Sequence, residues 1–318
     1  MPHRRPRHAR RLAPLAAAAA LLLAHAAAGQ EQAPTATPSA DATDRSLVHP
    51  DDRLTLDTAA LARRPWTIQV EPMLWWTSPG GKIRLPGTSE GAASSDRVRV
   101  ERLNLDTPRF SPAAEVHIDA EPWRFSLSAG AFSLSREETT ADRSFQLGDV
   151  AVSEGDMLDT DFDYVTAELT VGRLMYRHDF AAASKQPEDA VPVLLSLYGL
   201  GGLRLYDLDI AVRDITTGVE SASQQFYVEP ILGVRAELDI DRDYGLDLQI
   251  SGGYYADSDR SVSSLDIIVG FRWTPTPNIG WQIGWRQILT WMEDGEGASE
   301  FEYSGGLAGL YTGVVIRF

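Results

Sequence analysis

The last twenty residues of the chain, SEFEYSGGLAGLYTGVVIRF, constrain its fold more than any other stretch. Counted back from the end, every second side chain forms one largely apolar face, made of Phe318, Ile316, Val314, Thr312, Leu310 and Ala308. A two-residue period predicts a β-strand, because successive side chains on a pleated backbone point to opposite faces. The strand ends on an aromatic residue without a polar tail, which we do not expect of a domain that folds in water. An all-β protein with an apolar outer face is the first prediction.

Residues 1–28 predict a secretory signal peptide. Five arginines precede the apolar run Leu12–Leu23, and small residues up to Ala28 offer a cleavage site. A membrane-spanning helix would need about twenty apolar residues. Residues 29–64 are rich in Ala, Thr, Pro, Asp and Gln, which predicts a flexible periplasmic lead-in. The folded domain is expected over residues 65–318.

The charge balance and the absence of cysteine exclude several classes of function. Without the signal peptide, 24 basic and 45 acidic residues remain, a net charge of −21. Nucleic acid is not expected as a partner, because phosphates attract Lys and Arg. The chain has no Cys, so disulfides, thiolate chemistry and lipidation at Cys are excluded.

Apolar and polar residues alternate in ten stretches after residue 65. The predicted strands cover about residues 66–76, 108–120, 123–131, 164–177, 193–205, 227–238, 246–254, 265–273, 279–291 and 299–318. Each is about long enough to cross a bilayer at a tilt. Every second connection is short, such as Glu121-Pro122, and longer or more acidic loops fall between them. This pattern predicts a transmembrane antiparallel up-and-down β-barrel of about ten strands, with eight or twelve as alternatives.

Aromatic residues near the strand ends predict membrane girdles, because Trp and Tyr prefer the bilayer interface. The predicted girdle residues are Trp66, Trp76, Trp123, Trp273, Trp281, Trp285, Trp291 and Phe318. With the alternating strands and the closing Val315-Ile316-Arg317-Phe318, they resemble the bacterial outer-membrane β-barrel superfamily, most of all the small OmpA/OmpW-like porin group. The resemblance implies location in the cell outer membrane, contact with its lipid, and insertion by the barrel-insertion machinery through the C-terminal strand. It matches no functional motif.

Charged residues on the opposite strand faces are expected to point into the lumen. The predicted lumen-lining charged residues are Glu115, His117, Glu168, Arg204, Glu229, Arg235, Glu237, Asp247, Asp266, Arg272 and Arg286. A soluble sandwich or lipocalin-like barrel would instead be apolar on that face. The charges either pair across a narrow lumen and plug it, or line a wet path for small solutes. The predicted function is structural or surface interaction, and a small-solute porin is the alternative.

His117 is the one candidate general base, flanked on its own strand face by Glu115 and Asp119. A serine hydrolase would also need a serine within hydrogen-bond reach, and Ser126 and Ser128 on the adjacent strand could face inward. An inward histidine in a polar network is more often structural. We therefore expect no catalysis, and an outer-membrane hydrolase acting on lipid is the second alternative.

Glu137 to Asp163 reads as a long acidic loop with nine carboxylates. Its carboxylates at Asp156, Asp159, Asp161 and Asp163 could hold Ca²⁺, although the spacing is not that of an EF-hand. The alternatives are a solvated loop, or a loop that meets divalent cations bridging surface lipids. The sequence contains no phosphate-binding Gly loop and no Zn-type ligand motif, so no cofactor is expected.

Overall fold

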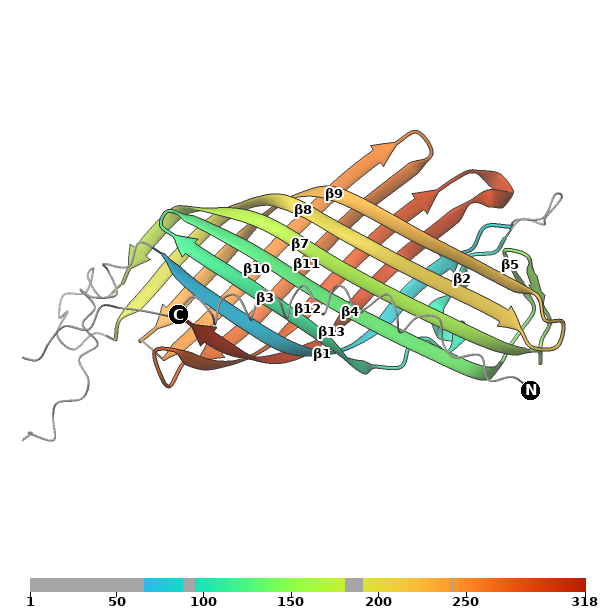
Figure 1. Cartoon of the computed structure of the whole chain (residues 1–318), viewed down its shortest axis with the longest axis horizontal. Coiled ribbons are helices and arrows are strands. Elements are labelled where there is room, and N and C mark those ends of the chain that lie inside the picture. Colours follow the sequence, from blue (N-terminus) through green and yellow to red (C-terminus); the bar gives the residue numbers. More distant parts are fainter. Residues whose placement is uncertain (1–65, 88–94, 181–190, 242) are drawn as a thin grey trace, which may run out of the picture. The chain divides into compact units, whose positions relative to one another are not determined.

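The computed structural model describes residues 66–87, 95–180, 191–241 and 243–318. The predicted signal peptide, the lead-in with His49, and the connection 181–190 lie outside these residues. Ten long antiparallel strands run side by side around a barrel (Figure 1). They are β1 (Thr67–Arg84), β3 (Arg109–Ala120), β4 (Trp123–Thr140), β7 (Met157–Asp179), β8 (Val193–Asp214), β9 (Glu220–Ile240), β10 (Tyr244–Asp257), β11 (Arg260–Trp273), β12 (Ile279–Asp294) and β13 (Phe301–Arg317).

The barrel closes because β13 pairs with both β12 and β1. The seam between β1 and β13 runs from Gln69 opposite Arg317 to Arg84 opposite Glu302. All other long strands pair with their neighbours in the chain, which is the up-and-down order. The predicted antiparallel barrel of ten strands is therefore confirmed. Among the described residues, no helix is long and apolar enough to cross a membrane.

The two ends of the barrel differ in their connections. At one end, here called the turn end, Glu121-Pro122 joins β3 to β4 and five residues join β11 to β12. At the other, the loop end, the β1–β3 connection carries β2 (Val98–Arg99) and the 3-10 helix η2 (Val100–Leu103). The β4–β7 connection carries the hairpin β5 (Phe145–Leu147) and β6 (Val150–Val152), and the β12–β13 connection carries the short helix η3 (Gly297–Ser299). The loop end thus holds the extra structure.

The prediction of a long acidic loop over Glu137–Asp163 is wrong. β4 continues to Thr140 and β7 already begins at Met157. On β7, the partly exposed Asp159, Asp161 and Asp163 alternate with the buried Leu158, Thr160 and Phe162. The carboxylates therefore belong to a strand whose outer face meets water and whose inner face is largely apolar.

The outer surface of the barrel is apolar only near the turn end. On β7 its outward side chains are Val165, Leu169 and Val171, whereas the outward positions closer to the loop end are aspartates. β7, β8 and β9 contain 23, 22 and 21 residues, and a tilted strand crosses a bilayer in about 9–11 residues. These strands therefore extend past the apolar belt by roughly half their length.

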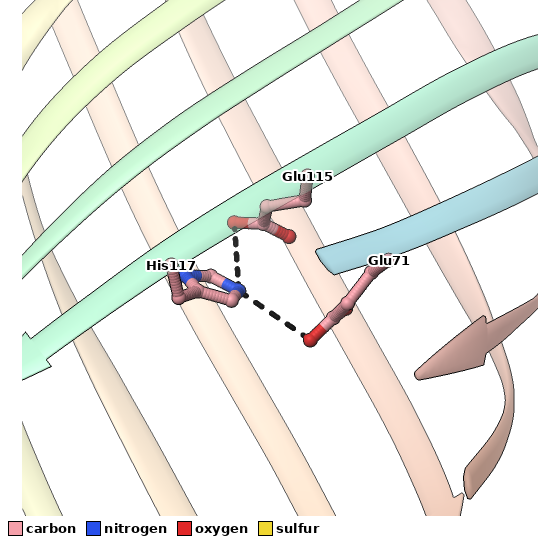
Figure 2. Close-up of side chains that lie close together, drawn as sticks. All are labelled: Glu71, Glu115 and His117. Atoms are coloured by element: carbon pink, nitrogen blue, oxygen red, sulfur yellow. Dashed lines mark ion pairs between the residues drawn. The ribbon is translucent and has the colours of Figure 1, made fainter. Parts of the chain in front are cut away.

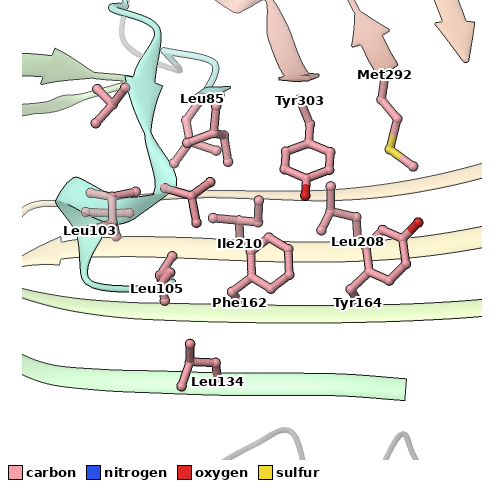
Figure 3. Packing of buried hydrophobic residues seen from close by; sticks show 14 of the residues in the cluster. Leu85, Leu103, Leu105, Leu134, Phe162, Tyr164, Leu208, Ile210, Met292 and Tyr303 are labelled. Carbon is pink, nitrogen blue, oxygen red and sulfur yellow. The ribbon is translucent and has the colours of Figure 1, made fainter. Parts of the chain in front are cut away.

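The interior has two layers, which we call the ionic layer and the apolar layer. The ionic layer lies inside the apolar outer belt and consists of buried Arg, Glu, Asp and His side chains. The apolar layer fills the loop end with a cluster that includes Leu208, Ile210 and Phe162 (Figure 3). Leu85, Leu103 and Leu105 of the β1–β3 connection join that cluster, so this connection packs with the barrel interior at the loop end.

Candidate functional site

The part of the ionic layer nearer the loop end is built around Arg204 on β8, which is fully buried. Its Nε donates to Glu168 Oε2 at 2.7 Å, and its Nη1 and Nη2 donate to Ser264 Oγ at 2.7 Å and Ser251 Oγ at 2.6 Å. Asp266 Oδ2 and Glu229 Oε1 lie 3.5 and 3.6 Å from the same guanidinium group. Hydrogen bonds and charges on several strands therefore satisfy this buried cation, as a low-dielectric interior requires.

Arg286 on β12 extends this network. Its Nη2 and Nε donate to the two oxygens of Asp266 at 2.6 and 3.2 Å, a bidentate pair. Its guanidinium carbon also lies 5.7 Å from the centre of the buried Trp75 ring. Tyr206 donates to Glu229 at 3.0 Å. The acids near Arg204 thus have further donors of their own.

The ionic layer nearer the turn end is centred on Arg235 of β9. Its Nε lies 2.8 Å from Glu237 Oε1, and Asp247 and Glu115 lie 3.7 and 3.8 Å from its Nη atoms. Two other arginines complete this part. Arg272 contacts Asp239 at 2.9 Å and Asp247 at 3.5 Å, and Arg124 forms ion pairs with Glu237 and Asp119.

His117 on β3 is buried beside the barrel seam, together with carboxylates from β1 and β3 (Figure 2). Its Nε2 lies 3.5 Å from Glu71 Oε1 and 3.5 Å from Glu115 Oε1. Its Nδ1 lies 2.8 Å from Ser126 Oγ on β4. A serine, an imidazole and two carboxylates therefore lie in contact, which is the order of groups in a nucleophile activated by a general base.

The space beside this group is small. A cavity of about 30 Å³ adjoins Glu71 and Glu115 and is also lined by Arg235, Gln282 and Tyr311. That volume suffices for one or two water molecules, but not for an acyl chain or a peptide. A larger pocket of about 230 Å³ opens at the turn end, beside Asp119, Arg124 and Glu237. The arrangement at His117 can hold a proton or a small ion more readily than it can process a substrate.

The apolar layer crosses the lumen. Tyr164 on β7 and Thr290 on β12 share a hydrogen bond of 3.1 Å between their hydroxyl groups, and these two strands have four strands between them on either side of the ring. The ring centres of Phe162 on β7 and Tyr303 on β13 are 6.1 Å apart. Both tyrosines and Phe162 are almost fully buried. Side chains from opposite walls therefore meet at this level.

The predicted lumen-lining residues lie in the ionic layer, where all of them are buried or nearly so. The predicted girdle residues lie on the outer surface, and most are about half exposed. Trp273 and Trp281 face each other near the turn end, whereas Trp76 pairs with Phe110 nearer the loop end. Trp285 lies between these levels, opposite Val269 and Leu310.

The predicted calcium ligands and His178, the second histidine of the described residues, lie outside the ionic layer. Asp159, Asp161 and Asp163 follow one another along the outer face of β7. Among the described residues, the only group of three His, Asp or Glu side chains with suitable spacing for a metal is Glu71, Glu115 and His117. His178 lies near the end of β7, 4.6 Å from the Phe180 ring.

Glu71 is the important residue that the sequence reasoning missed. It follows Gln69 on the polar face of β1, and both are buried. The period of two between Gln69, Glu71 and Met73 would have placed Glu71 inside the barrel. Its neighbours on other strands, Glu115 directly opposite and Gln282 of β12, could not be identified without the register.

Comparisons with known proteins add no function. No protein-family model matches the chain, and no curated protein matches it. The chain is similar to solved structures of the outer membrane protease OmpT from Escherichia coli (10% identity, 80% of this chain and 97% of that chain, TM-score 0.40) and of Neisserial surface protein A (12%, 80% and 98%, 0.29). It is also similar to Ail of Yersinia pestis in complex with the heparin analogue sucrose octasulfate (11% identity, 80% of this chain and 100% of that chain, TM-score 0.31).

With TM-scores under 0.5, these likenesses carry no argument about function or mechanism. The assignment of the fold depends on the protein itself: a closed ring of ten antiparallel strands, an apolar outer belt between exposed aromatic residues, and a charged interior at the same level. The chain has the fold of the bacterial outer-membrane β-barrels.

Proposed function

We propose that the protein is a closed, non-conducting outer-membrane barrel whose role is structural or surface interaction. The observation that carries this proposal is the contact across the lumen between Tyr164 and Thr290, at 3.1 Å, from opposite walls of the ring. Below it, Arg204 is fully buried among Glu168, Glu229 and Asp266. Two successive layers therefore favour a lumen without a continuous water path.

The part that remains available for interaction is the loop end. We place it outside the cell, because short turns face the periplasm in barrels of this kind and loops face the medium. This orientation follows from an N-terminal segment that is exported and remains periplasmic. Export by the signal peptide and residence in the outer membrane belong to the same proposal.

The outer wall of the loop end is acidic beside the lipid surface. Asp161 and Asp163 on β7 lie next to Asp207 and Asp209 on β8, and Asp163 is directly opposite Asp209. Divalent cations that also bind phosphorylated lipid headgroups are the partners that this surface fits.

Catalysis is not part of the proposal. His117 has a serine hydroxyl within reach, but Ser126 is more than nine-tenths buried and the adjoining cavity is about 30 Å³. A hydrolase acting on lipid would need room for an acyl chain and an exposed nucleophile.

Single-channel conductance in a planar bilayer tests the proposal. The purified protein, shown to be folded by its shifted mobility in unheated gels, is expected to give no discrete current steps. Steps would instead favour the small-solute channel, and Arg235→Glu should then change its ion selectivity. Arg213→Glu, on the outer face of β8, is the matched charge reversal and should leave the ion selectivity unchanged.

A further inference from the structure

We propose that Glu71 of β1 and Glu115 and His117 of β3 form a binding site for a divalent transition-metal ion of the Zn²⁺ class, beside the seam where the barrel closes. The ligand atoms of the three residues all lie within 4.8 Å of one another. Figure 2 shows His117 Nε2 directed between the two carboxylates. This site is independent of whether the lumen conducts.

His117 provides the observation that points to a ligand. The side chain is 1% exposed, and its Nε2 has no hydrogen-bond partner among the described residues. A buried polar atom without a hydrogen-bond partner is energetically unfavourable. The two nearest acceptors, Glu71 Oε1 and Glu115 Oε1, are both 3.5 Å away, beyond the usual 2.7–3.2 Å of an N–H···O hydrogen bond.

Those distances suit a shared metal ion better than a shared proton. Zn²⁺ bonds of about 2.0–2.2 Å to nitrogen and oxygen place tetrahedral ligand atoms about 3.3–3.6 Å apart. The two separations of 3.5 Å from Nε2 fall in this interval. Ca²⁺ and Mg²⁺ prefer ligand sets made only of oxygen atoms, so a site with an imidazole ligand does not suit them. The adjoining cavity of about 30 Å³ leaves room for a water molecule as the fourth ligand.

The other ring nitrogen of His117 is held as a metal ligand requires. Nδ1 lies 2.8 Å from Ser126 Oγ. When Nδ1–H donates to this hydroxyl, the Nε2 lone pair is free for a metal. On the carboxylate side, Gln282 Nε2 donates to Glu71 Oε2 at 2.9 Å and Gln69 donates to Oε1. Ser126 therefore orients His117, and Gln282 and Gln69 orient Glu71.

The charged groups around the site nearly balance, so a bound cation would act locally, between Glu71 and Glu115. Glu71 and Glu115 are directly opposite each other on β1 and β3, a repulsive pair in the absence of a cation. Among the described residues, six carboxylates surround four guanidinium groups here. They are Glu71, Glu115, Asp119, Glu237, Asp239 and Asp247, with Arg124, Arg235, Arg272 and Arg317. The side chains of Asp119 and Asp239 are 32% and 42% exposed, so water screens these two carboxylates. The four more deeply buried carboxylates are matched in number by the four guanidinium groups.

The position of the site gives the ion a structural role. Glu71 belongs to the first barrel strand, which pairs with β13 on one side and β3 on the other. Gln282 of β12 and Arg317 of β13 reach the same cluster through Glu71 and Gln69. A metal ion here would join β1 to β3, and it would stabilise the pairing of these two strands next to the seam.

Metal titration of the purified protein tests the inference. After treatment with a chelator, the protein in detergent is expected to bind about one Zn²⁺ per chain, and Co²⁺ in its place should give the intense visible absorption of four-coordinate cobalt. His117→Gln and Glu71→Gln should each weaken binding by more than 100-fold, and Ser126→Ala by about 10–100-fold. His178→Gln is the matched control and should bind as the wild type does.

Two results would overturn the site: a wild-type protein that binds no stoichiometric Zn²⁺ or Co²⁺, or a His117→Gln variant with unchanged affinity. Glu115→Gln, confirmed as folded by gel mobility, replaces any variant that fails to fold. A histidine that merely shares a proton with the two carboxylates predicts the first of these results.

Discussion

The membrane-level half and the loop-end half of the same barrel have opposite polarity. On β7, Leu169 faces out and Glu168 faces in at the level of the apolar belt, whereas Asp163 faces out and Phe162 faces in only a few residues away. Neither strand geometry nor register changes between them. In the proposed membrane setting, the surroundings are lipid for one half and water for the other, and they determine which face of a strand is apolar.

The largest expected effect follows from removing the cation of the ionic layer. Arg204→Ala leaves Glu168 and Glu229 buried without their guanidinium partner, while Asp266 keeps Arg286, and such a loss costs about 3–5 kcal/mol. Urea unfolding in detergent, followed by tryptophan fluorescence, measures it. Arg213→Ala, on the outer face of the same strand, should change the free energy of unfolding by less than about 0.5 kcal/mol.

A similar loss is expected in the apolar layer, for a different reason. Phe162→Ala opens a cavity between β7 and the opposite wall, and truncation of a buried phenylalanine costs about 3–5 kcal/mol. Asp161→Ala, one residue away on the outer face, is the control and should be nearly neutral. Equal effects of the two substitutions in urea unfolding would contradict the assignment of inner and outer faces.

A charge introduced on the outer surface distinguishes lipid from water along one strand. Leu232 on β9 is 76% exposed within the apolar belt, so Leu232→Arg should destabilise the barrel by about 2–4 kcal/mol. Ala222 is exposed on the same face nearer the loop end, and Ala222→Arg should have almost no effect. If both variants unfold at the same urea concentration, the belt does not end between the two positions.

The smallest effect concerns the β8–β9 turn. Asp214 accepts hydrogen bonds from the Thr217 hydroxyl at 2.5 Å and from the Thr216 amide at 2.7 Å, and the Thr217 hydroxyl lowers the pKa of Asp214 below its ordinary value of 3.8. Because the folded-state pKa is lowered, the stabilisation is fully present above the ordinary pKa and is lost as the pH falls through the folded-state value. The Thr216 amide resonance should therefore titrate below pH 3.8. This transition should be absent in Asp214→Asn.

Sequence periodicity predicted the ring of ten strands because the apolar outer face repeats every second residue in each of them. It failed between Glu137 and Asp163 because the count of carboxylates outweighed the period: Leu158, Thr160 and Phe162 alternate with the aspartates as regularly as in any membrane-level strand. In this stretch the apolar side chains face inward and the acidic ones outward, the reverse of the membrane-level strands. That alternation could have identified the strand from the sequence.

The candidate site was only partly predictable, for a physical reason. Inward positions such as His117 and Glu115 follow from the period of a single strand. The contact of His117 with Glu71 and Ser126 depends on the register among β1, β3 and β4. That register depends on long-range pairing, and side-chain alternation alone does not specify which residues face each other.

Cysteine scanning of β7 distinguishes water, lipid and packed interior position by position, because the chain contains no natural cysteine. Single cysteines from residue 158 to residue 171 are treated with a water-soluble maleimide in membranes. A closed barrel in lipid predicts reaction at 159, 161 and 163, and none at 165, 167, 169 and 171, where lipid covers the wall. No reaction with the maleimide is expected at the even-numbered inward positions from 158 to 170, where the two layers fill the lumen. Reaction along the inward positions would contradict the closed barrel, and reaction at 167 and 169 would contradict the lipid belt.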